Sequence, residues 1–81
     1  MRKLIFLHAA WCGPCKHLIR TLLPKIEQEC PDQVESVDVS EDPQNYVRKF
    51  KVKKVPTFLL MEDGQLEKKV SGSPGLAVID W

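Results

Sequence analysis

Residues 11–15 read Trp11-Cys12-Gly13-Pro14-Cys15, and this stretch decides the fold because it places two cysteines between two different periodic patterns. Before it, the apolar run at residues 3–8 predicts a short strand that is covered on both faces. After it, apolar residues recur every three or four positions over residues 12–29, as in an amphipathic helix. The two cysteines are therefore expected where a strand ends and a helix begins.

The position of the cysteines at a helix start predicts redox chemistry. At this spacing their Cα atoms can lie within the ~4.4–6.8 Å that a disulfide requires. The partial positive charge of the helix N-terminus favours a thiolate at Cys12, and Lys16 adds positive charge nearby. Cys15 lies one turn along, on the apolar stripe, so we expect it to be more buried than an exposed Cys12. This asymmetry suits a two-step exchange, in which Cys12 attacks a substrate disulfide and Cys15 then attacks Cys12.

The rest of the chain predicts alternating strands and helices. Pro24 should kink the first helix or end it early. Residues 34–39 alternate as in a second strand, and Ser40-Glu41-Asp42-Pro43 is a helix-start signal, with Ser or Asp as cap and the proline in the first turn. That second helix is expected to run through Tyr46, Val47 and Phe50.

The C-terminal part predicts a hairpin followed by a helix. Strands are expected at residues 57–61 and 65–70, joined by the turn residues Asp63-Gly64. Ser73-Pro74 caps a short last helix that carries Leu76, Ile79 and Trp81. The order βαβαββα implies a parallel pair plus an antiparallel hairpin. We therefore predict an α/β fold with a four-stranded mixed sheet and helices on both faces, in a single domain over residues 1–81.

Composition narrows the classes of partner. The chain has 12 Lys and Arg against 11 Asp and Glu, a net charge of +1, which argues against nucleic acid as a partner. No apolar run approaches the ~20 residues of a membrane span, and the run at residues 4–7 is shorter than the ~7–15 residues of a secretory signal core. Three cysteines, an odd number, suit a reducing compartment. We expect a cytoplasmic protein.

Four features together resemble the thioredoxin family: the pentapeptide at residues 11–15, Val55-Pro56-Thr57, the hairpin Asp63-Gly64, and Gly72. The resemblance covers the chain from Leu4 onward and implies a thioredoxin-like fold and a thiol–disulfide oxidoreductase. It implies a cis peptide bond before Pro56 and a Val55 backbone that hydrogen-bonds an extended substrate segment. The apolar contact surface around Cys12 would consist of Trp11, Val39, Val55, Pro56 and Gly72.

The sequence also departs from the family pattern. Phe6 stands where members usually carry a buried aspartate that helps to deprotonate the second cysteine, and His8 stands where a tryptophan is common. Arg20 replaces a helix-kinking proline. By this comparison the chain is a small relative that lacks the first strand and helix and has a shortened last helix.

Several residues have two interpretations. The cysteines are either part of a metal site with Cys30, His8 and His17 or a redox pair. There is no second C-x-x-C pair, so we favour redox chemistry and expect no metal. His8 either fills space as a half-buried strand residue, which we favour, or transfers protons for Cys15.

Two features outside the motif also have a plain and a functional interpretation. Cys30 is expected to be a bystander thiol rather than a regulatory or dimer-forming one. Arg48, Lys49, Lys51, Lys53 and Lys54 form a basic run that is either a solvated face or a surface favouring acidic partners.

The motif predicts a protein-disulfide reductase that uses a dithiol–disulfide cycle of Cys12 and Cys15. Gly13 and Pro14 between the cysteines are typical of reducing members of the family that the chain resembles. We expect a monomer without a bound cofactor, with disulfide-containing proteins as substrates and a thioredoxin reductase-like protein as electron donor. The alternatives are a glutaredoxin-like protein recharged by glutathione and a non-catalytic interaction module with the same fold.

Overall fold

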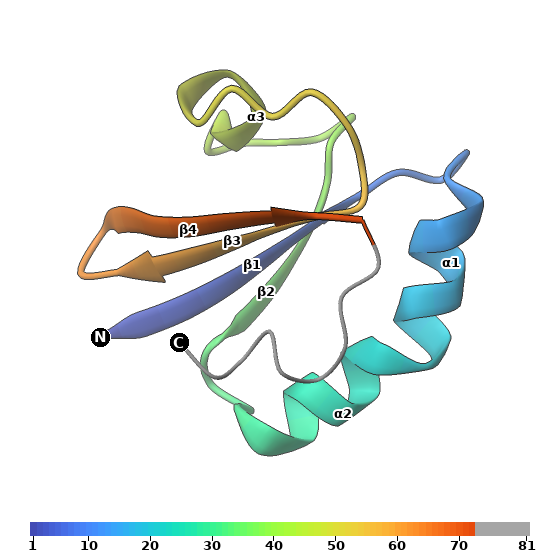
Figure 1. The fold of residues 1–81 in the computed structure, drawn as a ribbon, viewed down its shortest axis with the longest axis horizontal. Helices are drawn as coiled ribbons and strands as arrows, with labels where there is room; N and C mark the ends of the chain where they lie inside the picture. The colour runs from blue at the N-terminus through green and yellow to red at the C-terminus, as the bar shows by residue number, and fades with distance from the viewer. Residues whose placement is uncertain (73–81) are drawn as a thin grey trace.

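The computed structural model describes residues 1–72 and is built around one four-stranded sheet with the strand order β2-β1-β3-β4 (Figure 1). Three helices join the strands. In chain order the elements are β1 (Arg2–His8), α1 (Gly13–Arg20), α2 (Leu22–Glu29), β2 (Val34–Asp38), α3 (Tyr46–Lys49), β3 (Thr57–Glu62) and β4 (Gln65–Ser71).

Strand directions confirm the predicted mixed sheet. β1 runs parallel to β2 on one side and antiparallel to β3 on the other. β3 and β4 form an antiparallel hairpin. Its turn residues Asp63 and Gly64 have φ values of 52° and 84°. Two successive residues with positive φ match the right-handed twist of a tight hairpin, which is why Asp-Gly is suited to this position.

Helices lie on both faces of the sheet, as predicted. In Figure 1, α1 and α2 lie on one side of the sheet and α3 on the other. β1 supplies both cores, because successive side chains of a strand point to opposite faces. Leu4 and Phe6 pack in the cluster with α1 and α2, whereas Ile5 and Leu7 pack in the cluster that α3 borders. All four are at most 1% exposed, which explains the uninterrupted apolar run.

The first helical stretch is divided in two, as Pro24 predicts. The break falls at Thr21, which ends α1 and precedes α2. Pro24 has no N–H to donate to the carbonyl four residues earlier, and its ring clashes with that carbonyl. The affected carbonyl belongs to Arg20, so the helix ends one turn before the proline itself. Pro24 then lies in the first turn of α2, where no intrahelical donor is needed.

The second predicted helix is shorter than expected and begins later. The sequence predicts a start within Ser40–Pro43, with Pro43 in the first turn, but α3 covers only Tyr46–Lys49. Asn45 has φ of 59° and ψ of 38°, a left-handed conformation that cannot belong to a right-handed helix. Asp42 nevertheless caps α3 from a distance, because its carboxylate accepts the backbone N–H groups of Tyr46 and Val47, each at 2.9 Å.

Part of the sequence prediction falls beyond the described residues. The cap at Ser73-Pro74 and the last helix with Leu76, Ile79 and Trp81 lie outside residues 1–72. Within residues 1–72, none of the helices has the length and apolar character needed to span a membrane.

Two isoleucines, one on α1 and one on α2, allow a matched stability test. Ile26 on α2 is fully buried against the sheet, whereas Ile19 on α1 is 38% exposed. Ile26→Ala is expected to lower the free energy of unfolding by about 2–5 kcal/mol, because the lost methyl groups leave a cavity. Ile19→Ala should change it by less than about 1 kcal/mol. Urea denaturation measures both, and equal losses would contradict this account of how α2 is anchored.

Candidate active site

Cys12 and Cys15 are joined by a disulfide at the N-terminus of α1, with their Cα atoms 5.2 Å apart. Cys12 is the N-cap residue of α1 and has an extended backbone, with φ of −93° and ψ of 108°. Its Sγ accepts the backbone N–H of Cys15 at 3.1 Å. Pro14 lies in the first turn, where its missing N–H removes no helical hydrogen bond. The helix therefore directs a free donor at the first sulfur.

The expectation of an exposed Cys12 is wrong for this disulfide form. Cys12 is only 5% exposed, and Cys15 is 0% exposed. Both belong to the cluster that contains Phe6 and Phe58. Cys12 is covered because its sulfur is bonded to Cys15, and because its own N–H is held by the carbonyl of Ala9 at 3.2 Å. Cys15 is still the more buried of the two cysteines, as predicted, since only Cys12 keeps contact with solvent.

The residues around the disulfide differ sharply in exposure. Trp11 is 78% exposed, although it directly precedes Cys12. Gly13, Pro14 and Lys16 are exposed as well. The covered disulfide is therefore bordered by exposed residues of its own loop and helix start.

The segment before β3 is shaped by Pro56. The peptide bond Val55–Pro56 is cis, as the family resemblance implied. The carbonyl of Pro56 accepts the N–H of Gly72 at 3.0 Å, and Gly72 has φ of 92°, a conformation that suits glycine. The buried Thr57 hydroxyl donates to the carbonyl of Lys54 at 2.7 Å. The bond between Gly72 and Pro56 holds the start of β3 against the end of β4, and the Thr57 bond braces the turn before β3.

Three of the five expected contact residues line one shallow hollow of about 150 Å³. They are Trp11, Val39 and Val55. Pro56 and Gly72, hydrogen-bonded to each other, do not line this hollow. The apolar hollow, as we call it, is completed by Val47, Val52, Lys53 and Lys54.

Sequence reasoning missed Val47 and Val52 as part of this surface. The sequence predicts Val47 only as a residue of the second helix, and Val52 carries no motif. The signal that might have found Val52 is its position among the lysines just before Val55-Pro56.

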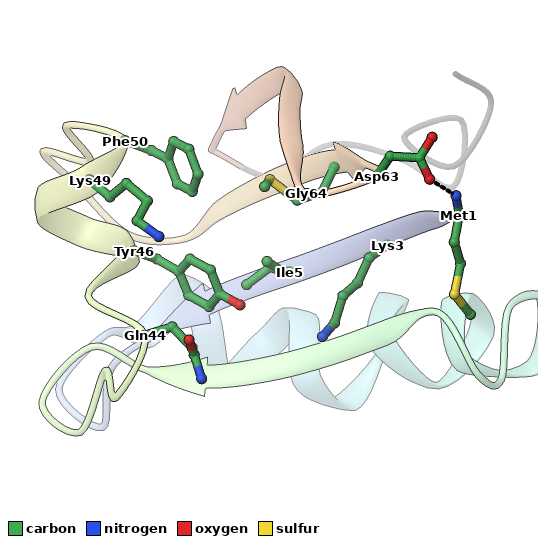
Figure 2. Close-up of a pocket in the computed structure, with 10 residues that line it drawn as sticks. Met1, Lys3, Ile5, Gln44, Tyr46, Lys49, Phe50, Asp63 and Gly64 are labelled. Atoms are coloured by element: carbon green, nitrogen blue, oxygen red, sulfur yellow. Dashed lines mark hydrogen bonds and ion pairs between the residues drawn. The ribbon is translucent and has the colours of Figure 1, made fainter.

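A second hollow, of about 370 Å³, lies on the other face of the sheet and contains neither cysteine (Figure 2). Ile5, Tyr46 and Phe50 line it, and its rim is largely charge-paired. The ammonium of Lys3 lies 2.7 Å from Glu35, and that hydrogen bond raises the pKa of Lys3. The N-terminal amine of Met1 pairs with Asp63. Burial raises the pKa of Tyr46. Nothing in this hollow contributes to the cysteine chemistry.

His8 lies on the same face of the sheet as the disulfide. It is half-buried, and its ring stacks on Phe6 with centroids 5.3 Å apart. Phe6 in turn stacks on Phe58 at 4.9 Å. In the β1–β2 register His8 is opposite Asp38, whose pKa is lowered by hydrogen bonds from the N–H and hydroxyl of Ser40 and by the charge of His8. The contacts of His8 are thus chiefly packing contacts.

The other candidate ligands are not brought together. Cys30 lies half-buried at the C-terminal end of α2, and its thiol is free. His17 is exposed on α1. Among residues 1–72 no group of three or more histidine, cysteine, aspartate or glutamate side chains is arranged to hold a metal ion.

Comparison with known proteins agrees with this geometry. The family model described as Thioredoxin matches residues 2–80. A thioredoxin from Mycobacterium tuberculosis (strain H37Rv) is 36% identical over 78 residues, which make up 94% of this chain and 66% of that protein. A bifunctional thioredoxin reductase/thioredoxin from Mycobacterium leprae is 36% identical over 78 residues, covering 94% of this chain and 17% of that protein. The chain thus spans slightly less than two thirds of the first relative and a small part of the second.

A solved structure matches the fold. The crystal structure of mitochondrial thioredoxin 3 from Saccharomyces cerevisiae, in its oxidized form, is similar with a TM-score of 0.82 and 36% sequence identity. The match covers 98% of this chain and 74% of that chain.

The difference in burial predicts the order in which the thiols react after reduction. In the reduced protein, Cys12 should be alkylated by iodoacetamide before Cys15, because Cys12 retains solvent contact and receives the N–H of Cys15. Cys30→Ser removes the third thiol and simplifies peptide mapping by mass spectrometry. Labelling of Cys15 first would contradict the assigned asymmetry.

Proposed function

This chain belongs to the thioredoxin family, and we propose that it reduces protein disulfides by cycling Cys12 and Cys15 between dithiol and disulfide. Proteins of this family are thiol–disulfide oxidoreductases. The observation that carries the proposal is the Cys12–Cys15 disulfide at the start of α1, with the N–H of Cys15 directed at the sulfur of Cys12. The exposed Trp11 beside it supports contact with a large partner.

The first step forms a mixed disulfide. The Cys12 thiolate attacks one sulfur of the substrate disulfide, a bond forms between the two proteins, and the other substrate sulfur leaves as a thiolate. The helix N-terminus stabilises the anionic form of Cys12 before the attack. The N–H of Cys15 at 3.1 Å is the nearest donor for that charge.

The second step releases the substrate. Cys15 loses its proton and attacks the sulfur of Cys12, which forms the intramolecular disulfide and expels the second substrate thiolate. Both substrate thiolates then take protons from water. Two electrons have passed from the cysteine pair to the substrate. In the closed disulfide the two Cα atoms are 5.2 Å apart, within the range that an unstrained disulfide requires.

The substrate would lie across the surface next to the disulfide. The apolar hollow formed around Trp11, Val39 and Val55 would receive an apolar side chain that flanks the substrate cysteine. The backbone of Val55 would hydrogen-bond an extended substrate segment, with Pro56 and Gly72 shaping the adjoining edge. Gly13 and Pro14 lie exposed between the cysteines, on the side where Cys12 has its remaining contact with solvent.

The electrons would come from a protein reductase, without a bound cofactor in this chain. The fusion of a thioredoxin reductase with a thioredoxin in the Mycobacterium leprae relative supports such a donor. We further propose that the protein acts as a monomer in the cytoplasm, although the relatives include a mitochondrial protein. Glutathione as the donor is the competing proposal.

The proposed cycle is tested by insulin disulfide reduction, followed as turbidity, with three electron donors offered separately. Activity is expected with dithiothreitol and with thioredoxin reductase plus NADPH. Activity with glutathione alone would instead favour a glutaredoxin-like protein. Absence of activity with every donor would favour a non-catalytic interaction module.

Cysteine variants provide the matched controls for that assay. Cys12→Ser is expected to abolish reduction, because the attacking thiolate is gone. Cys15→Ser is expected to accumulate a mixed disulfide with insulin, visible by non-reducing mass spectrometry, because the second step is blocked. Cys30→Ser should keep the wild-type rate. A fully active Cys15→Ser protein would contradict the two-step cycle.

A separate prediction concerns His8. His8→Phe is expected to keep the rate of disulfide reduction and its pH profile, because phenylalanine preserves the stack on Phe6. The profile from about pH 5 to 9 brackets the ordinary titration range of histidine. If the rate of His8→Phe no longer rises or falls with pH where the wild-type rate does, proton transfer would instead be assigned to this residue.

A further inference from the structure

A third hollow continues the apolar hollow and is lined by lysines. It measures about 400 Å³, and its cationic residues are Lys51, Lys53, Lys54 and Lys69. Val52, Lys53 and Lys54 line both hollows, so the two form one continuous surface. We call this second part the lysine hollow. It connects through the shared residues to Trp11, the immediate neighbour of Cys12.

Charge is strongly segregated here. The whole chain carries a net charge of +1, yet no aspartate or glutamate of the described residues lines either hollow. Within residues 1–72, the ammonium groups of the four lysines form no ion pair. By contrast, the cations at the rim of the hollow in Figure 2 include Met1 and Lys3, which are paired with Asp63 and Glu35. The lysine hollow thus holds positive charge that no carboxylate of residues 1–72 pairs with.

The backbone holds the lysine hollow in shape. The ammonium of Lys69 on β4 donates to the carbonyls of Phe50 and Lys51, at 3.2 and 3.3 Å. These bonds tie the loop after α3 to the hairpin. Lys51 has φ of 54°, and the Thr57 hydroxyl holds the carbonyl of Lys54. Lys51, Lys53 and Lys54 therefore project from a braced loop and Lys69 from a strand, which reduces the entropy lost when a partner binds.

We propose that this surface selects substrates, and that its occupant is an acidic segment next to the disulfide of the substrate protein. The inference rests on the proposed function. An apolar residue near the substrate cysteine would occupy the apolar hollow, and acidic residues further along the same segment would reach the lysine hollow. Complementary charge raises association rates by about 10–10³-fold and suppresses partners of like charge. Acidic substrates are therefore reduced faster than basic ones of the same reactivity.

Three disulfide peptides test the proposal. Each carries the same intramolecular disulfide with a flanking leucine, and they differ only in four neighbouring residues, which are glutamate, serine or lysine. The pre-reduced full chain is mixed with each peptide, and acid quenching with chromatography yields the second-order rate constant. At low salt the glutamate peptide should react at least about tenfold faster than the lysine peptide. At about 1 M salt the ratio should approach one, because screening shortens the range of the charges to about 3 Å.

Matched charge variants locate the effect. Lys53→Glu/Lys54→Glu is expected to make the lysine peptide react faster than the glutamate peptide. Lys53→Gln/Lys54→Gln should make the difference between their rate constants smaller. Lys25→Glu/Lys68→Glu changes the net charge by as much as Lys53→Glu/Lys54→Glu, but at residues that line neither hollow. It should leave the glutamate peptide as the fastest of the three. The serine peptide corrects for any change in the reactivity of Cys12, because such a change alters all three rates equally.

The outcomes separate this inference from the proposed function. Equal rates for the three peptides at low salt would overturn the charge selection and leave disulfide reduction intact. Equal shifts in the two Glu variants would overturn the assignment to the lysine hollow, since net charge alone would explain them. If Lys53→Glu/Lys54→Glu slows all three peptides equally, the lysines act on the reactivity of Cys12 and not on the choice of substrate, which would also overturn the inference. If no peptide is reduced by the wild-type chain, the proposed function itself fails.

Discussion

The rest of the structure depends on the enclosure of residues 4–7 of β1. This strand pairs along both edges, with β2 and β3, and buries side chains on both faces. Leu4 and Phe6 contribute to one core, and Ile5 and Leu7 to the other. Burying four large apolar side chains stabilises a small domain by several kcal/mol, at about 1.5–3 kcal/mol for each. The placement of both helical layers follows from this one strand, because each layer must cover one of its faces.

The redox site is a direct consequence of where β1 ends. The chain leaves the sheet after His8, turns through Ala9 and enters α1 with Cys12 as its cap. Because the Cys15 side chain then faces the core shared with Phe6, one sulfur is held by packing while the other borders solvent. The same core therefore stabilises the fold and makes the two cysteines unequal. A disulfide exchanger needs this inequality, since one sulfur must meet the substrate and the other must act only afterwards.

Much of the fold could be predicted because its signals are local. The burial of residues 4–7, the Asp63-Gly64 turn and the break caused by Pro24 each follow from neighbouring residues and backbone sterics. The start of α3 could not be predicted in this way. Pro43 and the cap residues before it suggested an early start, but Asn45 adopts a left-handed conformation and the Asp42 carboxylate caps Tyr46 instead. Two local patterns competed there, and sequence spacing does not show which one prevails.

The chemistry of this protein is encoded in a short range of sequence, whereas its contact surface is assembled over a long one. Two cysteines three residues apart at a helix start can close a disulfide, because the local geometry of the helix start brings their Cα atoms to 5.2 Å. The apolar hollow instead combines Trp11 with Val39 and Val55, and the lysine hollow adds Lys69 from β4 to the loop before β3. Only the strand order and the packing of the loops make these residues neighbours. The burial of Cys12 is likewise decided by the tertiary structure, since it depends on the residues that pack around the helix end and not on the helix itself.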